Sequence, residues 1–309
     1  MPPPELPTPA PAGPLVHATL IVADAAPCIA AYGGLGLRAS AGGTVGTGQA
    51  AAWGQPQLAG CAVTWLAPRG PASAAAAPLL RLITVPGTLP RPTRFSQGWL
   101  ALEILVRDVD ALAPRVAAAG FEIVGLPADL DVSPAIRAMQ AIGPAGELLY
   151  LTQVKSPVPP FSIPLSADLP VGIDIGPLFI AVLSTPSREA VIEACSPLHP
   201  AAVLRFDTRI TVLNRALGRD LAQRWPVATV QWGGHSLFEI DEVVDAAVQN
   251  PTDLLPAGLA WVSMRAGPDP SPRPHASAAG WHPTGAGAGE GVNQGLMLVS
   301  PAAWLEVLR

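Results

Sequence analysis

The sequence predicts an α+β protein built from repeated strand–helix–strand units. The stretch from Leu15 to Gly36 reads as a strand, a helix and a Gly-Leu-Gly turn, and the same order returns about 84 positions later, from position 17 to position 101. Hydrophobic residues make up 50% of the 309 residues and charged residues only 13%. A chain of this length and composition can bury a large core, so we expect several units to pack together.

The first unit begins with a strand that carries a histidine. His17, Thr19 and Ile21 project to one face, while the apolar residues between them project to the other and pack on the following helix. Gly33 to Gly36 follow a helix rather than a strand, so they are interpreted as a helix stop and not as a dinucleotide loop. On the cavity side of the strand, the imidazole of His17 would bind a metal or move a proton. The alternative is a structural histidine at the start of a strand, with its ring nitrogens hydrogen-bonded to the backbone.

The second unit, WLALEILVRDVDALAPRVAAAGFEI, repeats this order. Asp108 or Asp110 can cap its helix, and Leu112, Val116 and Ala119 recur on one helical face. The unit closes with AIGPAGELLYLTQV, a glycine-rich turn that runs into a strand.

Two further units are predicted in the second half of the chain. One has a strand at PLFIAVLST, a helix opened by Pro186 and Ser187, and three strand-like runs. The other, more degraded, runs from GLAWVSMRA to QGLMLVSPAAWLEVLR. Leu178 and Leu259 are about 81 positions apart, close to the spacing of the first pair.

This arrangement resembles the vicinal oxygen chelate superfamily, which includes glyoxalase I, extradiol dioxygenases and bleomycin-resistance proteins. The resemblance is clear from Leu15 to Val154 and weaker beyond. It implies four βαβββ modules in two pairs, each pair a cup-shaped mixed sheet with helices outside. We therefore expect a flexible proline-rich tail (1–14), a first paired domain (15–155), a linker (156–175) and a second, degraded paired domain (176–309).

The resemblance also points to site residues on the first and last strands of each module. His17, Leu20, Val22 and Asp24 match the family's first-strand pattern. At the position in the second module that matches His17 stands Ala101, which cannot be a ligand, although Glu103 lies two residues on and on the same face. The usual ligand set is therefore incomplete.

The last strands depart from the family pattern as well. Tyr150 stands where the family has a glutamate, and Arg81 lies near that place in the first module. A phenol is a poor ligand for a hard cation. We therefore interpret His17, Glu103 and Tyr150 as catalytic acid–base groups in a site without a metal. The individual alternatives are a salt bridge for Glu103 and a core position for Tyr150.

The remaining candidates are substrate contacts and a metal alternative. Arg81, if it faces inward, would hold an anionic oxygen. If a divalent metal (iron, manganese, zinc or magnesium) is the cofactor, His17 and Glu103 are its first candidate ligands, and Glu239 and Glu306 are less favoured ones. The alternative for Glu239 and Glu306 is a surface position at the end of a strand. The expected substrate-binding residues are Thr19, Ile21, Arg81, Trp99 and Leu105.

Composition limits the partners. The net charge of −5 and the lack of a basic run argue against nucleic acid. No apolar run is long enough to span a membrane, and the N-terminus lacks the pattern of a signal peptide, so a cytoplasmic location is expected. A small-molecule substrate is the expected partner, and the sequence is also compatible with a homodimer. Two functions follow: lyase or isomerase chemistry on an apolar or aromatic substrate (ring cleavage if a metal is bound), or sequestration of a ligand without turnover.

Overall fold

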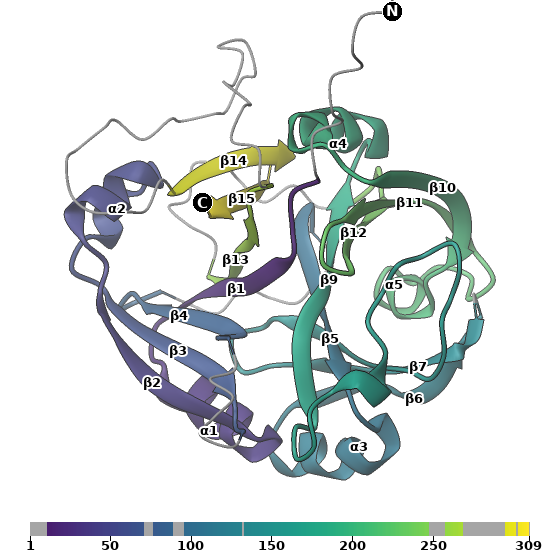
Figure 1. Ribbon diagram of the computed structural model, residues 1–309, viewed down its shortest axis with the longest axis horizontal. Helices are drawn as coiled ribbons and strands as arrows, with labels where there is room; N and C mark the ends of the chain where they lie inside the picture. The colour runs from purple at the N-terminus through teal and green to yellow at the C-terminus, as the bar shows by residue number, and fades with distance from the viewer. Residues whose placement is uncertain are drawn as a thin grey trace, which may run out of the picture.

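The computed structural model describes residues 11–70, 77–88, 96–131, 133–246, 257–267, 294–300 and 302–308. Two curled mixed sheets stand side by side, with α1 and α3 together at one end (Figure 1). The predicted α+β class, with cup-shaped sheets formed by paired modules and helices outside, is confirmed. None of the helices in the described ranges is long and apolar enough to cross a membrane.

The first sheet has seven strands in the order β14-β15-β13-β1-β4-β3-β2. Its strands are β1 (Leu15–Val22), β2 (Leu37–Thr44), β3 (Ala62–Pro68), β4 (Leu80–Thr84), β13 (Gly258–Arg265), β14 (Gln294–Ser300) and β15 (Ala303–Leu308). The first module therefore pairs with the fourth, through antiparallel contact of β1 with β13.

The second sheet has eight strands in the order β10-β11-β12-β9-β5-β8-β7-β6. Its strands are β5 (Gly98–Val106), β6 (Glu122–Leu130), β7 (Ser133–Ile142), β8 (Leu148–Val154), β9 (Ile175–Thr185), β10 (Ala202–Arg209), β11 (Arg224–Trp232) and β12 (Ser236–Glu242). Here the second module pairs with the third, through antiparallel contact of β5 with β9.

This pairing corrects the expectation that neighbouring modules share a sheet, with 15–155 forming one pair and 176–309 the other. The strand patterns fix which face of each strand is buried. They do not fix the partner, because the first strand of every module has an edge free to pair. The partner is decided by packing between distant parts of the chain.

The helices begin and end where the sequence signals lie. Helix α1 (Ala26–Leu35) ends at Gly36, whose φ of 101° is left-handed backbone that glycine adopts without strain. Asp108 caps α3 (Val109–Ala118), and Ser187 caps α4 (Arg188–Cys195), each accepting a hydrogen bond from a backbone amide of the first turn. The shorter helices are α2 (Thr47–Ala52), α5 (Thr211–Ala216) and the 3₁₀ turns η1 (Pro56–Leu58), η2 (Ser166–Asp168) and η3 (Ser196–Leu198).

Three apolar clusters account for the core. The largest joins the two sheets to one another and to α1, α3 and α4, and the apolar face of β1 (Ala18, Leu20 and Val22) belongs to it, as the alternation predicts. The second cluster lies on the opposite face of the eight-stranded sheet and the third on the opposite face of the seven-stranded sheet. The hollow side of each sheet therefore has its own set of side chains.

The end of the proline-rich tail is held in place. The amide of Ala12 donates to the carbonyl of Leu198 at 3.0 Å, and that of Gly13 donates to the carbonyl of Arg265 at 2.8 Å. The expectation of a flexible segment through residue 14 is therefore wrong for residues 11–14, and the first ten residues lie outside the described ranges. The tail is fixed because its backbone groups pair with η3 of the third module and with the end of β13 in the fourth.

Candidate functional site

A cavity of about 710 Å³ lies in the hollow of the eight-stranded sheet. Strands β5 to β12 and helix α5 contribute to its walls, and most of the side chains that line it are apolar. Strand β6 ends at Leu130 and β7 begins at Ser133, so no helix lies between these two strands to fill the hollow. Its volume suits a small organic ligand.

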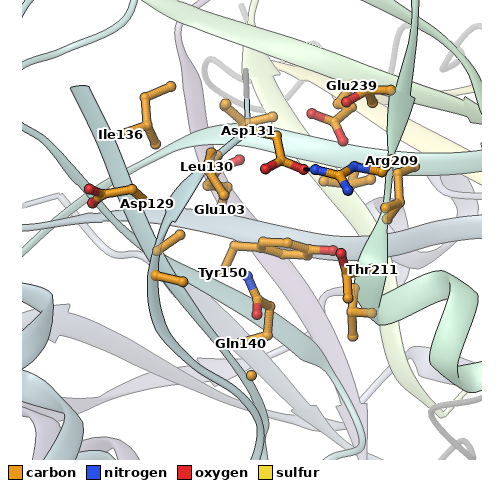
Figure 2. A pocket seen from close by; sticks show the side chains of 18 of the residues that line it. Glu103, Asp129, Leu130, Asp131, Ile136, Gln140, Tyr150, Arg209, Thr211 and Glu239 are labelled. Atoms are coloured by element: carbon orange, nitrogen blue, oxygen red, sulfur yellow. Dashed lines mark hydrogen bonds and ion pairs between the residues drawn. The ribbon is translucent and has the colours of Figure 1, made fainter. Parts of the chain in front are cut away.

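Glu103 and Tyr150 lie together in this cavity (Figure 2). They are register partners on the parallel strands β5 and β8, so their side chains leave the sheet side by side. Thr152 donates a hydrogen bond to Oε1 of Glu103 at 2.7 Å. Burial, reinforced by the negative charge of Glu239, raises the pKa of Glu103 to about 8. This carboxyl group is therefore mostly neutral at pH 7 and can still ionise.

Tyr150 supplies a neutral hydroxyl group to the same cavity. Burial, followed by the charges of nearby carboxylates, raises the pKa of the phenol well above its ordinary value. The phenol keeps its proton at neutral pH and can donate a hydrogen bond to a ligand oxygen.

Two further carboxyl groups stand on β12. Glu239 lines the cavity, and Asp241 projects to the same face two residues on. Burial raises the pKa of both groups, and for Asp241 the neighbouring Glu239 adds to the effect. Asp241 is 1% exposed, and its Oδ1 has no hydrogen-bond partner within the part of the chain that the structure describes.

An ion pair crosses the rim of the cavity. The guanidinium of Arg209, at the end of β10, donates to the carboxylate of Asp131, which follows β6 (Figure 2). Asp129 pairs with Lys155 at 2.9 Å. Arg215 of α5 is a second arginine on the lining. The charged residues of the rim are exposed to solvent, whereas in the interior Glu103 is buried and Glu239 is half-buried.

Aromatic rings complete the cavity wall. Phe161 and Phe206 face each other edge to face, with ring centroids 6.2 Å apart, and both line the cavity with Tyr150. Flat or aromatic ligands suit walls of this kind.

The hollow of the seven-stranded sheet is filled instead. His17, Arg81, Ser263 and Glu306 meet there, and each is at most 5% exposed. Arg81 donates to Oε2 of Glu306 at 2.7 Å and to Oγ1 of Thr19 at 2.9 Å. Ser263 also donates to Oε2 of Glu306, at 2.5 Å. The carboxylate is thus enclosed by donors.

Aromatic side chains close this second hollow. The indole of Trp53, which follows α2, donates to Oε1 of Glu306 at 2.8 Å. The guanidinium of Arg81 lies over three indole rings, at 4.7 Å from that of Trp53 and 5.5 Å from those of Trp65 and Trp261. Because α2 and η1 carry Trp53 and Leu58 into this hollow, it forms part of the core.

Electrostatics in the filled hollow favour a charged acid and a neutral histidine. Burial works to raise the pKa of Glu306, but the charge of Arg81 and the hydrogen bonds outweigh it, and the pKa falls to about 2. Burial lowers the pKa of His17, whose Nε2 lies 3.0 Å from Oγ of Ser263. The pair of Arg81 and Glu306 is therefore the charged centre of this hollow.

These positions correct part of the predicted site. Glu103 and Tyr150 meet as expected, but His17 lies in the other sheet and shares no cavity with them. The reason is the module pairing: the first module joins the fourth, so its inward face meets Glu306. The predicted group of three therefore divides between two hollows.

The expected substrate contacts do not line the cavity. Thr19, Ile21 and Arg81 belong to the filled hollow, where Arg81 does face inward but holds a carboxylate of the protein. Trp99 is buried between the sheets and donates to the carbonyl of Trp304 at 2.6 Å, and Leu105 is buried beneath the cavity.

Several lining residues carried no functional prediction from the sequence. Phe206 and Thr208 alternate along β10, so a period of two was the available signal. Glu239 was expected only as a less favoured metal ligand or a surface residue at a strand end, and it lines the cavity. Arg209 carried no such signal, because its ion pair depends on the distant residue Asp131.

Among the residues that the structure describes, the metal alternative finds no ligand group in either hollow. In the filled hollow, His17 Nε2 and Glu306 Oε2 are 3.7 Å apart, but a guanidinium already binds that carboxylate. In the hollow of the eight-stranded sheet, Ala101 and Val182 pair at the positions that match His17 and Ser263 of the other sheet. Neither of these two side chains can be a metal ligand. Among the described residues, no three or more His, Cys, Asp or Glu side chains group closely enough to hold a metal ion.

Comparison with known proteins shows the fold. No protein-family model and no curated protein sequence matches the chain. Among solved structures, it is similar to glyoxalase I from Zea mays, with 13% identity and a TM-score of 0.61, covering 95% of this chain and 91% of that one. It is also similar to a putative dioxygenase from Bacillus subtilis, with 11% identity and a TM-score of 0.59, covering 97% and 86%. The chain has the vicinal oxygen chelate fold.

Proposed function

We propose that the cavity of the eight-stranded sheet binds an apolar, aromatic small molecule and catalyses proton transfer on it, as a lyase or isomerase that needs no metal. Glu103 is the proton carrier and Tyr150 the hydrogen-bond donor. The observation that supports this most directly is their placement: a buried carboxyl group and a neutral phenol side by side in a cavity of about 710 Å³. His17 has no part in this proposal.

The chemistry follows from the protonation states. A carboxyl group with a pKa of about 8 exists in both forms near neutral pH, which suits a group that accepts and returns a proton. Its carboxylate form takes a proton from a carbon next to a carbonyl group, and the electron pair of the broken C–H bond moves to the carbonyl oxygen. The Tyr150 hydroxyl stabilises that oxygen by donating a hydrogen bond. Return of the same proton to another carbon completes an isomerisation.

Proton exchange tests this mechanism without knowledge of the natural substrate. Aryl ketones and related carbonyl compounds are incubated with the protein in D₂O, and loss of the proton signal next to the carbonyl is followed by NMR. We expect exchange with the unaltered protein, loss of about 100-fold or more in Glu103→Gln and a smaller loss in Tyr150→Phe. The control is Glu122→Gln, which removes an exposed glutamate that does not line the cavity. Exchange that persists in Glu103→Gln contradicts the assigned role.

A second function, binding without turnover, is favoured by the aromatic walls. Phe161 and Phe206 offer two ring faces and edges to a flat ligand without any chemistry. Tight binding of an aromatic compound together with no exchange in any tested carbonyl compound would support sequestration over catalysis.

A further inference from the structure

We propose that the ligand of this cavity carries a basic nitrogen: it is an aromatic or apolar amine, bound as its ammonium ion beside Glu239 and Glu103. This inference rests on the proposed function only in taking the cavity as the ligand site. It adds the charge of the ligand, which neither the fold nor the acid–base chemistry specifies.

The ionisable groups on the inner wall of the cavity, apart from the phenol of Tyr150, are all carboxyl groups. Glu103 and Glu239 line it, and Asp241 stands behind Glu239 on the same face of β12. The cations on the described lining, Arg209 and Arg215, are exposed at the rim. Arg209 is moreover paired with Asp131. An organic cation that enters would meet the acids of the inner wall and, on the described lining, no buried guanidinium.

Acceptor capacity on the cavity wall is also left without a cation. Thr152 donates to Oε1 of Glu103, and no donor to its Oε2 is seen among the described residues. Behind the wall, the buried carboxyl group of Asp241 contacts that of Glu239, and its Oδ1 has no other hydrogen-bond partner among the described residues. Two carboxyl groups in contact without a cation cost free energy that an ammonium ion bound to Glu239 would recover.

The filled hollow shows what such an acid requires in this fold. Glu306 on β15 pairs in register with Ser263, as Glu239 on β12 pairs with Val182. Arg81 on β4 pairs with Thr19, as Tyr150 on β8 pairs with Glu103. The guanidinium that neutralises Glu306 is therefore replaced by a phenol at the matching position of the cavity. The cavity therefore keeps the matching acid, Glu239, but has no cation at the position that matches Arg81.

The walls suit the rest of such a ligand. The rings of Tyr150, Phe161 and Phe206 line the cavity, and aromatic faces attract organic cations in addition to packing against apolar groups. A hydrated metal ion would gain little from these walls, whereas an arylalkyl ammonium ion uses both the acids and the rings.

Three probes of the same shape and different charge test the inference. They are 2-naphthylmethylamine (a cation at pH 7), 2-naphthylmethanol (neutral) and 2-naphthoate (an anion), each titrated calorimetrically into the full-length protein. We expect the amine to bind at least about tenfold more tightly than the alcohol, and the anion to bind most weakly. In the double variant E103Q/E239Q, this preference should fall to about threefold or less.

Matched variants and outcomes keep the test decisive. Glutamine resembles the neutral acid in shape, and both carboxyl groups have raised pKa values, so the double variant should fold; its thermal melt checks this. E122Q removes a negative charge outside the cavity and should leave the preference unchanged. Equal binding of amine and alcohol, tighter binding of the anion, or a preference that survives in the double variant overturns this inference alone. Failure of all three probes to bind overturns the proposed function with it.

Discussion

The buried ion pair of the filled hollow leads to a quantitative prediction for Glu306→Gln. The carboxylate of Glu306 is fully buried and accepts hydrogen bonds from Arg81, Ser263 and Trp53. A fall of its pKa from 4.5 to about 2 corresponds to about 3 kcal/mol of stabilisation. Glutamine removes this charge and leaves the guanidinium of Arg81 buried without a counter-ion, so we expect the free energy of unfolding at pH 7 to fall by about 3–5 kcal/mol.

The acid limb of the stability curve gives the sign of the effect. Because the folded-state pKa of Glu306 is lowered, its stabilisation is present above about pH 4.5 and is lost as the pH falls toward 2. Urea unfolding, followed by tryptophan fluorescence between pH 3 and pH 7, measures both quantities. The difference between the unaltered protein and E306Q should shrink toward the acid end of that range.

Two control variants separate the ion pair from general damage. Glu189→Gln breaks an exposed pair with Arg205 and should leave the unfolding free energy unchanged within error. The double variant R81M/E306L replaces both charges by apolar groups and should regain most of the stability lost in E306Q. If E306Q were within about 0.5 kcal/mol of the unaltered protein, or if the double variant were as unstable as E306Q, the reasoning would be refuted.

Three more outcomes are expected. The kcat/KM for proton exchange should rise with pH through about 8, the pKa of Glu103, because the carboxylate is the base; a profile flat from pH 6 to 9 would exclude that role. Glu147, which accepts a hydrogen bond from Tyr32 at 2.6 Å, has a pKa raised to about 7 by burial, so stability should fall as pH rises from about 4.5 to 7, and urea unfolding of Glu147→Gln should show a weaker pH dependence. Arg209→Ala removes the ion pair with Asp131 across the rim and should speed both association and dissociation of a bound probe in stopped-flow fluorescence without changing the thermal melt; unchanged rates would show that the pair does not restrict entry.

Local signals in the sequence predicted local structure well. The face of β1 that holds Ala18 and Leu20, the cap at Asp108 and the stop at Gly36 all depend on residues within one turn or one strand, and each is confirmed. The placement of His17 could not be predicted in the same way. It depends on which of the first strands of the other three modules pairs with β1, and that choice is made by contacts between residues more than 200 positions apart.

The candidate site likewise has one part that local sequence patterns predicted and another that depends on distant contacts. Glu103 and Tyr150 belong to one module, and their meeting follows from the parallel pairing of its first and last strands, which the resemblance already implied. Glu239 enters from another module, and the sequence showed only that a glutamate stood near the end of a strand. Its role at the cavity required the contact between β5 and β9, which crosses the boundary of the two expected domains.

The two hollows share one backbone plan and differ in how an inward carboxylate is compensated. In the seven-stranded sheet, Arg81 and Trp53 enclose Glu306, and the insertion of α2 and η1 supplies the side chains that exclude water. In the eight-stranded sheet, the direct turn from β6 to β7 omits such an insertion, and Tyr150 stands where an arginine would neutralise the acid. A carboxylate in an apolar hollow must be protonated, paired or solvated. The first hollow provides the pairing within the chain, so it contributes to stability. The second leaves the pairing to a ligand or a proton, and for that reason it is the hollow for which we propose binding and acid–base chemistry.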